Sequence, residues 1–269
     1  MDIVIYLVIG LCMGVLGGML GIGGSVFMIP AMTLAFDENQ HLYQAAAMIC
    51  NFFVASSSML AHRKAEAWVK SVLLWLVPAA IVGIFGGVML SNAPVFEGEK
   101  SYLLARAFGI FLVYVVIYNS YRLYLHLHPK IEVVSKSMPP KKIARVFSVI
   151  CGAITGLAAG LLGIGAGTVA TPLQQVTLKL PLKNAMSNSA VTIVCISWLG
   201  AIYKNATLAQ HGIAVADSLK IAAWVIPGAV VGGFIGGHLM HTLPKNIVRG
   251  IFIGVCLMAA IKLLTVTPN

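Results

Sequence analysis

Long apolar stretches alternate with short polar segments along this chain, in two groups separated by a polar, basic segment at 122–145. The first group covers 3–36, 42–61, 71–91 and 102–121, and the second covers 146–178, 185–203, 213–240 and 247–264. About 20 apolar residues cross a bilayer as a helix. The pattern therefore predicts an all-α integral membrane protein with about eight transmembrane helical segments.

The second group of apolar segments repeats the first. GVLGGMLGIGGSVFMIP (14–30) aligns with GLAAGLLGIGAGTVATP (156–172) at a constant offset of 142, which keeps glycines and a proline in step. A P-x4-G-x3-G pattern recurs in the same way, from Pro78 and from Pro227. We therefore predict two homologous halves, with a first transmembrane repeat at 1–125, a cytoplasmic linker at 126–145 and a second transmembrane repeat at 146–269.

Each half opens with an apolar segment that clustered glycines interrupt, first at LGIGGS (20–25). In lipid, such a break in a helix is tolerated only against protein or a wet cavity. The N–H groups and the dipole at the start of the following helix favour an anion. Paired breaks at matching places in two halves point to a transporter's midplane site. The outer glycines of each segment, such as Gly14 and Gly156, are more typical of helix-packing faces.

The way in which these glycine-broken elements cross the membrane stays open. If each crosses once, the chain has eight spans and the N-terminus lies in the cytoplasm. If each is re-entrant and returns to its own side, each half has three full spans, the halves are inverted and the N-terminus lies outside. The distribution of Lys and Arg favours the second topology slightly, and both topologies place the linker in the cytoplasm.

Composition and charge agree with a membrane protein. The 269 residues are 59% hydrophobic and 10% charged, whereas soluble domains carry about 25% charged residues. The net charge of +10 is explained by basic loops on the cytoplasmic side, so we expect no nucleic-acid partner. The five cysteines show no metal-binding spacing, and we expect no cofactor and no metal.

Polar residues within apolar spans are costly in lipid, so each is a candidate ligand as well as a candidate for hydrogen bonding between helices. With the motif glycines they form the predicted substrate-binding set: Gly21, Gly23, Gly24, Ser25, Asn51, Ser57, Gly163, Gly165, Gly167, Thr168, Gln174, Ser187, Asn188 and Ser189. No Asp or Glu lies in the middle of a predicted span. Coupling to protons and coupling to sodium both stay open.

The duplicated GGxxGxGGxxxxxP element, GGMLGIGGSVFMIP (17–30) and AGLLGIGAGTVATP (159–172), resembles the TauE/SafE family of sulfite-exporter-like membrane permeases. The resemblance covers essentially the whole chain and implies transport of sulfur-containing anions such as sulfite, sulfonates or sulfoacetate. Two departures bear on the site. Members often show Thr-Ser where this chain has Ala46 and Ala47, and Ala166 interrupts the second glycine cluster.

Together these features predict a secondary transporter of small sulfur-containing anions, working by alternating access between the repeats in a bacterial inner membrane. Its partners would be the anion and the lipid bilayer, and homo-oligomers stay open. The alternatives are a channel for anions or small solutes, and a membrane subunit with a structural role only. We do not expect an enzyme, because the spans hold no nucleophile–base pair and no metal motif.

Overall fold

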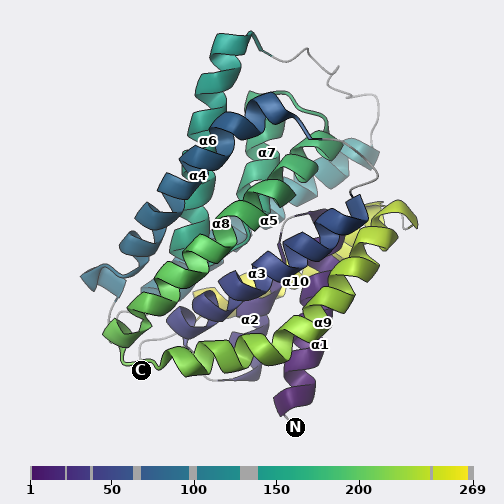
Figure 1. Ribbon diagram of the computed structural model, residues 1–269. Coiled ribbons are helices and arrows are strands. Elements are labelled where there is room, and N and C mark those ends of the chain that lie inside the picture. Colours follow the sequence, from purple (N-terminus) through teal and green to yellow (C-terminus); the bar gives the residue numbers. More distant parts are fainter. Residues whose placement is uncertain are drawn as a thin grey trace.

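The structure is a computed structural model that describes residues 2–21, 23–36, 39–62, 68–96, 102–127, 139–242 and 245–265. Within these residues all regular structure is helical (Figure 1). The first part of the chain forms α1 (Asp2–Leu20), α2 (Ser25–Ala35), α3 (Gln40–His62), α4 (Lys70–Ser91), the 3-10 helix η2 (Pro94–Phe96) and α5 (Tyr102–Leu127). The second part forms α6 (Lys141–Leu162), α7 (Gly167–Thr177), α8 (Leu182–Thr207), the 3-10 helix η5 (Leu208–His211), α9 (Val215–Thr242) and α10 (Lys245–Leu264).

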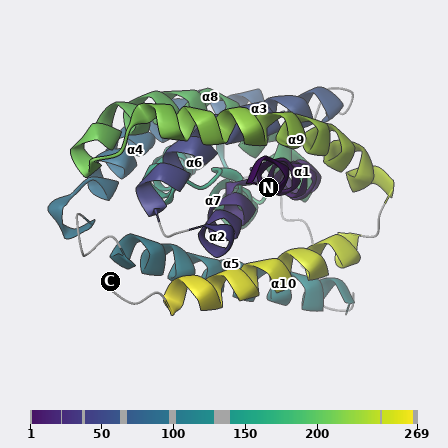
Figure 2. The same ribbon diagram turned by 90° about the horizontal axis from the view of Figure 1, so that it is seen from below.

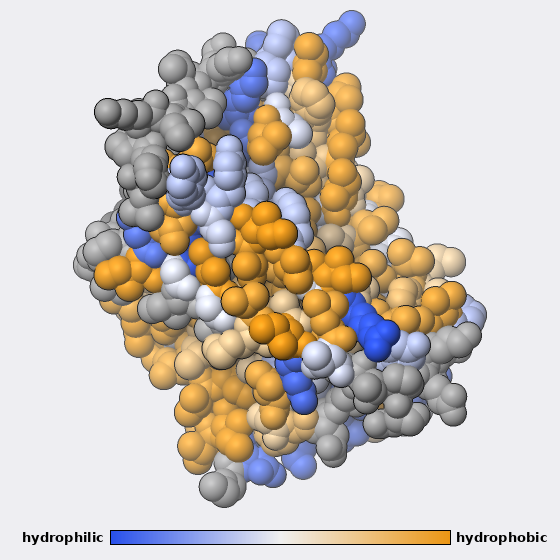
Figure 3. All heavy atoms as spheres, turned by 180° about the vertical axis from the view of Figure 1, so that it is seen from behind, coloured by the Kyte–Doolittle hydropathy of each residue, from blue (hydrophilic) through white to orange (hydrophobic). Residues whose placement is uncertain are grey.

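The helices confirm an all-α, multi-pass membrane protein. Among the described residues, six segments are long and apolar enough to cross a bilayer: Asp2–Leu20, Lys70–Ser91, Tyr102–Leu125, Lys141–Leu162, Asn184–His211 and Val215–Leu239. Large apolar side chains face outward along them, as at Leu74, Val82 and Met89 of α4, which are 68%, 73% and 70% exposed. Apolar residues also form a large continuous area on the face in Figure 3. Such a surface is stable in lipid and not in water.

The helices form three layers (Figure 2). The view from below shows α3, α4, α8 and α9 on one side, α5 and α10 on the other, and α1, α2, α6 and α7 between them. The short helices α2 and α7, which follow the glycine clusters, thus lie in the middle layer. Figure 1 shows both chain termini at one end of the molecule, called here the terminus side, and the start of α6 at the opposite end, called the linker side.

The chain doubles back after each glycine cluster. In the first part, the ring of Phe36, just past α2, stacks on Tyr6 of α1 with centroids 4.9 Å apart, and Gly24 packs against Met13. In the second part, Thr177 at the end of α7 lies 3.2 Å from Cys151 of α6, measured between Oγ1 and Sγ. Each short helix therefore runs back along the long helix before it, and α1–α2 and α6–α7 are helical hairpins.

The bounds of the two hairpins correspond. The helices α1 and α6 end at Leu20 and Leu162, and α2 and α7 cover 25–35 and 167–177, so each bound moves by the same 142 positions. The glycine clusters therefore stop the helix at the same point in both parts of the chain. We expected this from the aligned motifs, because glycine is the residue that most readily leaves the helical conformation.

The outer glycines are packing residues, as the sequence predicted. The helix α1 packs on α9, and α4 packs on α6. A Cβ atom at Gly14 would collide with the Ala229 carbonyl oxygen of α9, and one at Gly156 would collide with that of Ala80 in α4. Small residues let two backbones approach this closely in a membrane, where packing drives helix association.

Helices extend into both ends of the segment predicted as the linker. The helix α5 extends to Leu127 and α6 begins at Lys141, so both enter the segment predicted at 126–145, while 128–138 lie outside the described residues. The assignment of residues 1–125 and 146–269 to two repeats, and the cytoplasmic location of the linker, stay predictions.

Candidate functional site

The bends of the two hairpins meet in the buried centre of the molecule. A Cβ atom on Gly23 would lie 2.8 Å from the Gly165 Cα, so the two backbones touch there. The helix α2 begins at Ser25 and α7 begins at Gly167, so both start at this contact. We call the residues from 21 to 25 and 163 to 168 that the structure describes, together with Asn51, the hairpin junction. Two helix N-termini, each with a partial positive charge, converge in it.

Ser25 and Asn51 hold the hairpin junction together. The Gly165 N–H donates to Ser25 Oγ over 2.7 Å, and Asn51 Nδ2 donates to the same oxygen over 2.9 Å. The Ser25 N–H in turn donates to Asn51 Oδ1 over 3.2 Å. Ser25 is 0% and Asn51 is 1% exposed. One serine from α2 thus links the other hairpin to α3, and it uses both of its oxygen lone pairs to do so.

Glycine is required at the hairpin bends by conformation as well as by space. Gly21, Gly23 and Gly163 have φ of 60°, 78° and 69°, in the left-handed region that disfavours other residues. Gly163 also packs against Gln44 of α3, and a Cβ atom at Gly163 would lie 2.6 Å from Gln44 Cγ. Thr168 turns its hydroxyl to the Gly165 carbonyl at 3.2 Å, so it caps its own bend.

A second buried polar group lies between α7 and α8 and consists of Thr171, Gln174, Asn188 and Ser189. Ser189 Oγ lies 3.0 Å from Thr171 Oγ1 and accepts from Gln174 Nε2 over 3.2 Å. Asn188 Nδ2 donates to Gln174 Oε1 over 3.1 Å, and Asn188 Oδ1 accepts from the Val69 N–H over 2.9 Å. We call these four residues the α7–α8 cluster. It fixes α7 to α8, and its link to Val69 reaches the start of α4.

The corresponding positions between α2 and α3 are apolar. A shift of 142 carries the α7–α8 cluster onto Ile29, Met32, Ala46 and Ala47, all of which are fully buried in the apolar core. At Ala46 and Ala47, where the chain departs from the family pattern, α2 and α3 therefore pack through apolar side chains. Polar side chains therefore fill these positions in the second part of the chain and not in the first.

Most of the predicted site residues belong to one of these two groups. The hairpin junction contains Gly21, Gly23, Gly24, Ser25, Asn51, Gly163, Gly165, Gly167 and Thr168, and the α7–α8 cluster contains Gln174, Asn188 and Ser189. The structure does not bring Ser57 to either group. Its hydroxyl donates to the Val54 carbonyl over 2.9 Å, and it packs against Gly233 of α9. Ser187 is buried on α8 but takes no part in the bonds of the cluster.

Sequence reasoning missed several buried polar residues, among them Thr171, Gln44 and Lys204. Thr171 lies within the second glycine motif, whose polar positions we did not all select, and Gln44 lies in an apolar run without a motif, where its Nε2 donates to the Leu161 carbonyl at the end of α6 over 3.2 Å. Lys204 directly follows the apolar segment predicted at 185–203, where the sequence indicates a loop. The helix α8 extends to Thr207, and Lys204 within it is 0% exposed.

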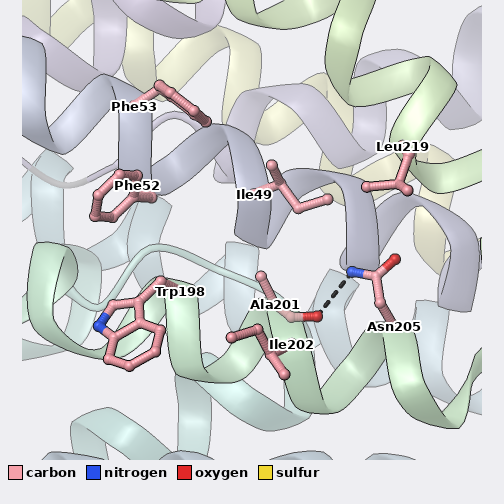
Figure 4. Close-up of a pocket in the computed structure, with 8 residues that line it drawn as sticks. All are labelled: Ile49, Phe52, Phe53, Trp198, Ala201, Ile202, Asn205 and Leu219. Carbon is pink, nitrogen blue, oxygen red and sulfur yellow. Dashed lines mark hydrogen bonds between the residues drawn. The ribbon is translucent and has the colours of Figure 1, made fainter.

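A groove on the membrane-facing surface is a separate feature. It has a volume of about 320 Å³ and lies between α3, α8 and α9, with Phe52 and Trp198 on facing helices (Figure 4). Its one polar lining residue, Asn205, donates to the Ala201 carbonyl within α8 over 2.7 Å. The lining is otherwise apolar and holds no charged side chain. Among the described residues, no group of three or more His, Cys, Asp or Glu side chains could hold a metal ion.

These observations define the class first: an α-helical, multi-pass membrane protein with two opposed helical hairpins and a buried polar centre. Comparison with known proteins then identifies the family. The model of the family described as sulfite exporter TauE/SafE matches residues 6–263. The chain belongs to the TauE/SafE family.

Several relatives are named probable membrane transporter proteins. MamO of Paramagnetospirillum magneticum is 28% identical over 287 residues, which cover 98% of this chain and 45% of that protein. MJ0441 of Methanocaldococcus jannaschii is 26% identical over 77% of this chain and 74% of its own length. YunE of Bacillus subtilis is 24% identical over 89% of both chains. This chain thus spans less than half the length of MamO, and no solved structure matches it.

Proposed function

We propose that the protein is a secondary transporter of small sulfur-containing anions, such as sulfite, a sulfonate or sulfoacetate. The observation that carries this proposal is the hairpin junction, where the N-termini of α2 and α7 meet in a buried centre with a serine hydroxyl and an asparagine amide. An anion is the ligand that such helix ends favour. The family description and the names of the relatives support transport.

The substrate would replace contacts that now link the two hairpins. Both lone pairs of Ser25 Oγ accept hydrogen bonds, so its O–H is left as a donor for an oxyanion oxygen. When the bends separate, the Gly165 N–H and the Asn51 amide become donors as well. Neutral donors and helix dipoles would bind the anion without a fixed cation, which allows its release on the other side.

We propose further that the two halves are inverted repeats with re-entrant first elements. The hairpins support this, because α2 and α7 return toward the end from which α1 and α6 start. The three helices of each half that follow its hairpin, α3–α5 and α8–α10, would then be the full crossings. The helices α1 and α6, although long and apolar enough to cross, would end at the bends in the buried centre. This topology places both termini outside and the linker in the cytoplasm of a bacterial inner membrane.

Alternating access would arise where the halves contact each other. The helices α3 and α8 pack together, while α1 packs on α9 and α6 packs on α4, so each hairpin rests on a helix of the other half. Rocking of one half would therefore move the bends apart on one side at a time. On the linker side, the α7–α8 cluster offers hydroxyl and amide groups along the route from the centre.

Counterflow in proteoliposomes tests this proposal. Vesicles loaded with unlabelled substrate should take up labelled sulfite, sulfoacetate or another sulfonate faster than empty vesicles do, and the rate should saturate. Flux that does not saturate and shows no counterflow would indicate a channel. No flux above protein-free vesicles for the whole set of sulfur oxyanions would refute the substrate class.

A further inference from the structure

Lys204 lies near the terminus-side end of α8 and is enclosed by hydrogen-bond acceptors. Its Nζ lies 2.9 Å from His41 Nδ1, 2.8 Å from Ser91 Oγ and 2.9 Å from Asn92 Oδ1. An ammonium group has three N–H donors, so these three acceptors use all of them. The Lys204 side chain is 0% and His41 is 4% exposed. This is an enclosed site for one positive charge.

The two histidines beside Lys204 are arranged to share that charge. His41 Nε2 lies 3.2 Å from the Phe96 carbonyl oxygen, so that nitrogen carries a hydrogen, and Nδ1 faces Lys204. The 2.9 Å between His41 Nδ1 and Lys204 Nζ fits one hydrogen bond, which a protonated Lys204 would donate to a neutral His41, so that the pair carries one charge. The His41 ring stacks on His211 with centroids 3.7 Å apart, and His211 Nε2 donates to Asn92 Oδ1 over 3.1 Å.

The Lys204 cluster, which we define as His41, Ser91, Asn92, Lys204 and His211, joins elements of both proposed halves. His41 belongs to α3, and Ser91 and Asn92 lie at the end of α4, whereas Lys204 and His211 belong to α8 and η5. Asn92 Nδ2 also donates to Thr207 Oγ1 over 2.8 Å. On the terminus side, these polar bonds hold α8 against α3 and α4.

We propose that the Lys204 cluster is a proton-binding site that opens the terminus side when it takes up a second proton. The inference rests on the proposed transport function and names the ion, a proton, that opens one side of the transporter. With one proton the cluster is closed, as in this structure. A second proton from the terminus-side solution forms an N–H bond at His41 Nδ1, which can then no longer accept from Lys204.

The doubly protonated cluster would hold two cations about one hydrogen-bond length apart in a buried site, which is strongly unfavourable. Separation of α3 and α4 from α8 relieves this repulsion by letting water reach both charges. The partly exposed His211 ring, stacked on His41, provides a contact between the buried pair and the solvent.

Among the described residues, two titratable side chains act on His41. The titratable groups that act on it are Lys204 from α8 and His211 from η5, while α4 contributes the neutral Ser91 and Asn92, and η2 contributes a backbone carbonyl. Glu97 and Glu99 follow η2 in the sequence and lie outside the described residues. The test must therefore separate the histidine from these two carboxylates.

The test measures opening directly, without substrate, in the full-length chain with its five native cysteines replaced. A cysteine at Leu208, which is 0% exposed, reports opening, and a cysteine at the neighbouring exposed Ala209 corrects for the pH dependence of the thiol reaction. Both cysteines are alkylated with a membrane-impermeant maleimide in vesicles whose terminus side faces outward. The reaction is run at about pH 7.5 and at about pH 5.5, which lie on either side of a histidine's usual pKa of about 6.5.

We expect the ratio of the Leu208→Cys rate to the Ala209→Cys rate to rise about fivefold or more on acidification, because a proton that binds one form shifts the population toward it. The rise should disappear in His41→Gln, which removes the group that takes up the second proton, and should shrink in Lys204→Met, which removes the neighbouring charge but leaves His41 buried. It should persist in the matched control His238→Gln, whose histidine is exposed on α9, and in Glu97→Gln/Glu99→Gln.

A ratio independent of pH in the otherwise unmutated chain would overturn the inference, as would loss of the rise in the Glu97→Gln/Glu99→Gln variant. If Lys204→Met does not fold, His41→Gln alone decides, with elution as a single species as its folding check. The outcome is separate from the proposed function. A chain that opens with acid but carries no sulfur oxyanion would refute the substrate, and one that carries the anion without acid-dependent opening would refute the proton site.

Discussion

Ser25→Ala tests the hairpin junction, because one oxygen atom there serves two donors from different elements. The substitution removes the acceptor of both the Gly165 N–H and the Asn51 amide, and both groups are buried. A buried donor left without a partner costs about 1–3 kcal/mol, so the two together should lower stability by about 2–6 kcal/mol. For a chain of this size, that loss should lower the Tm by about 5 °C or more.

The assay is thermal unfolding of the purified protein in detergent, followed by tryptophan fluorescence. Ser148→Ala is the matched control. Ser148 is 1% exposed, and its hydroxyl donates only to the Ala144 carbonyl of its own helix over 2.7 Å, so its loss should cost less than about 1 kcal/mol. If Ser25→Ala lowers the Tm no more than Ser148→Ala does, Ser25 does not link the hairpins and our description of the hairpin junction is wrong.

Three further predictions concern packing, the pathway and topology. Gly156→Val should abolish folding or lower the Tm by about 10 °C or more because its side chain would enter the α4 backbone, whereas Gly86→Val, with open space around it, should change the Tm by only a few degrees. Gln174→Leu should reduce substrate flux about tenfold or more, because it removes amide contacts of the α7–α8 cluster. The control Asn119→Leu loses one hydrogen bond within α5 and should keep its flux. Equal flux in the two variants would contradict a role of Gln174 in the pathway. A cysteine at Asn269 should react with an impermeant reagent added outside intact cells, and labelling only after the membrane is opened would contradict the inverted topology.

The glycine breaks were predictable from the sequence because their cause is local. Glycines interrupt an apolar run in both halves, and the helices stop at Leu20 and Leu162 and resume at Ser25 and Gly167. The backbone conformation required at Gly21 and Gly163 is one that glycine adopts without a steric penalty. The position at which glycines end a helix can therefore be predicted from the sequence alone.

The direction of the chain after each break was not predictable, since it depends on contacts that are distant in sequence. Whether α2 continues α1 or returns beside it is decided by packing such as that of Phe36 on Tyr6. The hydropathy of the two segments is the same in either arrangement. The distribution of basic residues gave only a slight preference, because the two topologies share most of their loops.

Buried polar partners were harder still to predict. Lys204 follows the last residue of an apolar segment, where a lysine commonly marks the end of a span. Lys204 can be buried within α8 because His41, Ser91 and Asn92, from helices far away in the sequence, supply acceptors for its three N–H groups. Only knowledge of those three-dimensional contacts distinguishes such a residue from an ordinary loop cation.

The central claim, that an anion binds at the hairpin junction, is tested most directly by substrate protection of a cysteine at position 25. In a chain with its five native cysteines replaced, Ser25→Cys is alkylated by N-ethylmaleimide with and without sulfoacetate, a sulfonate that does not itself consume the reagent. We predict that sulfoacetate slows the reaction in proportion to site occupancy and leaves a cysteine at Ala209 unaffected. An unchanged rate at position 25, under conditions where the same protein carries sulfoacetate in counterflow, would contradict the claim.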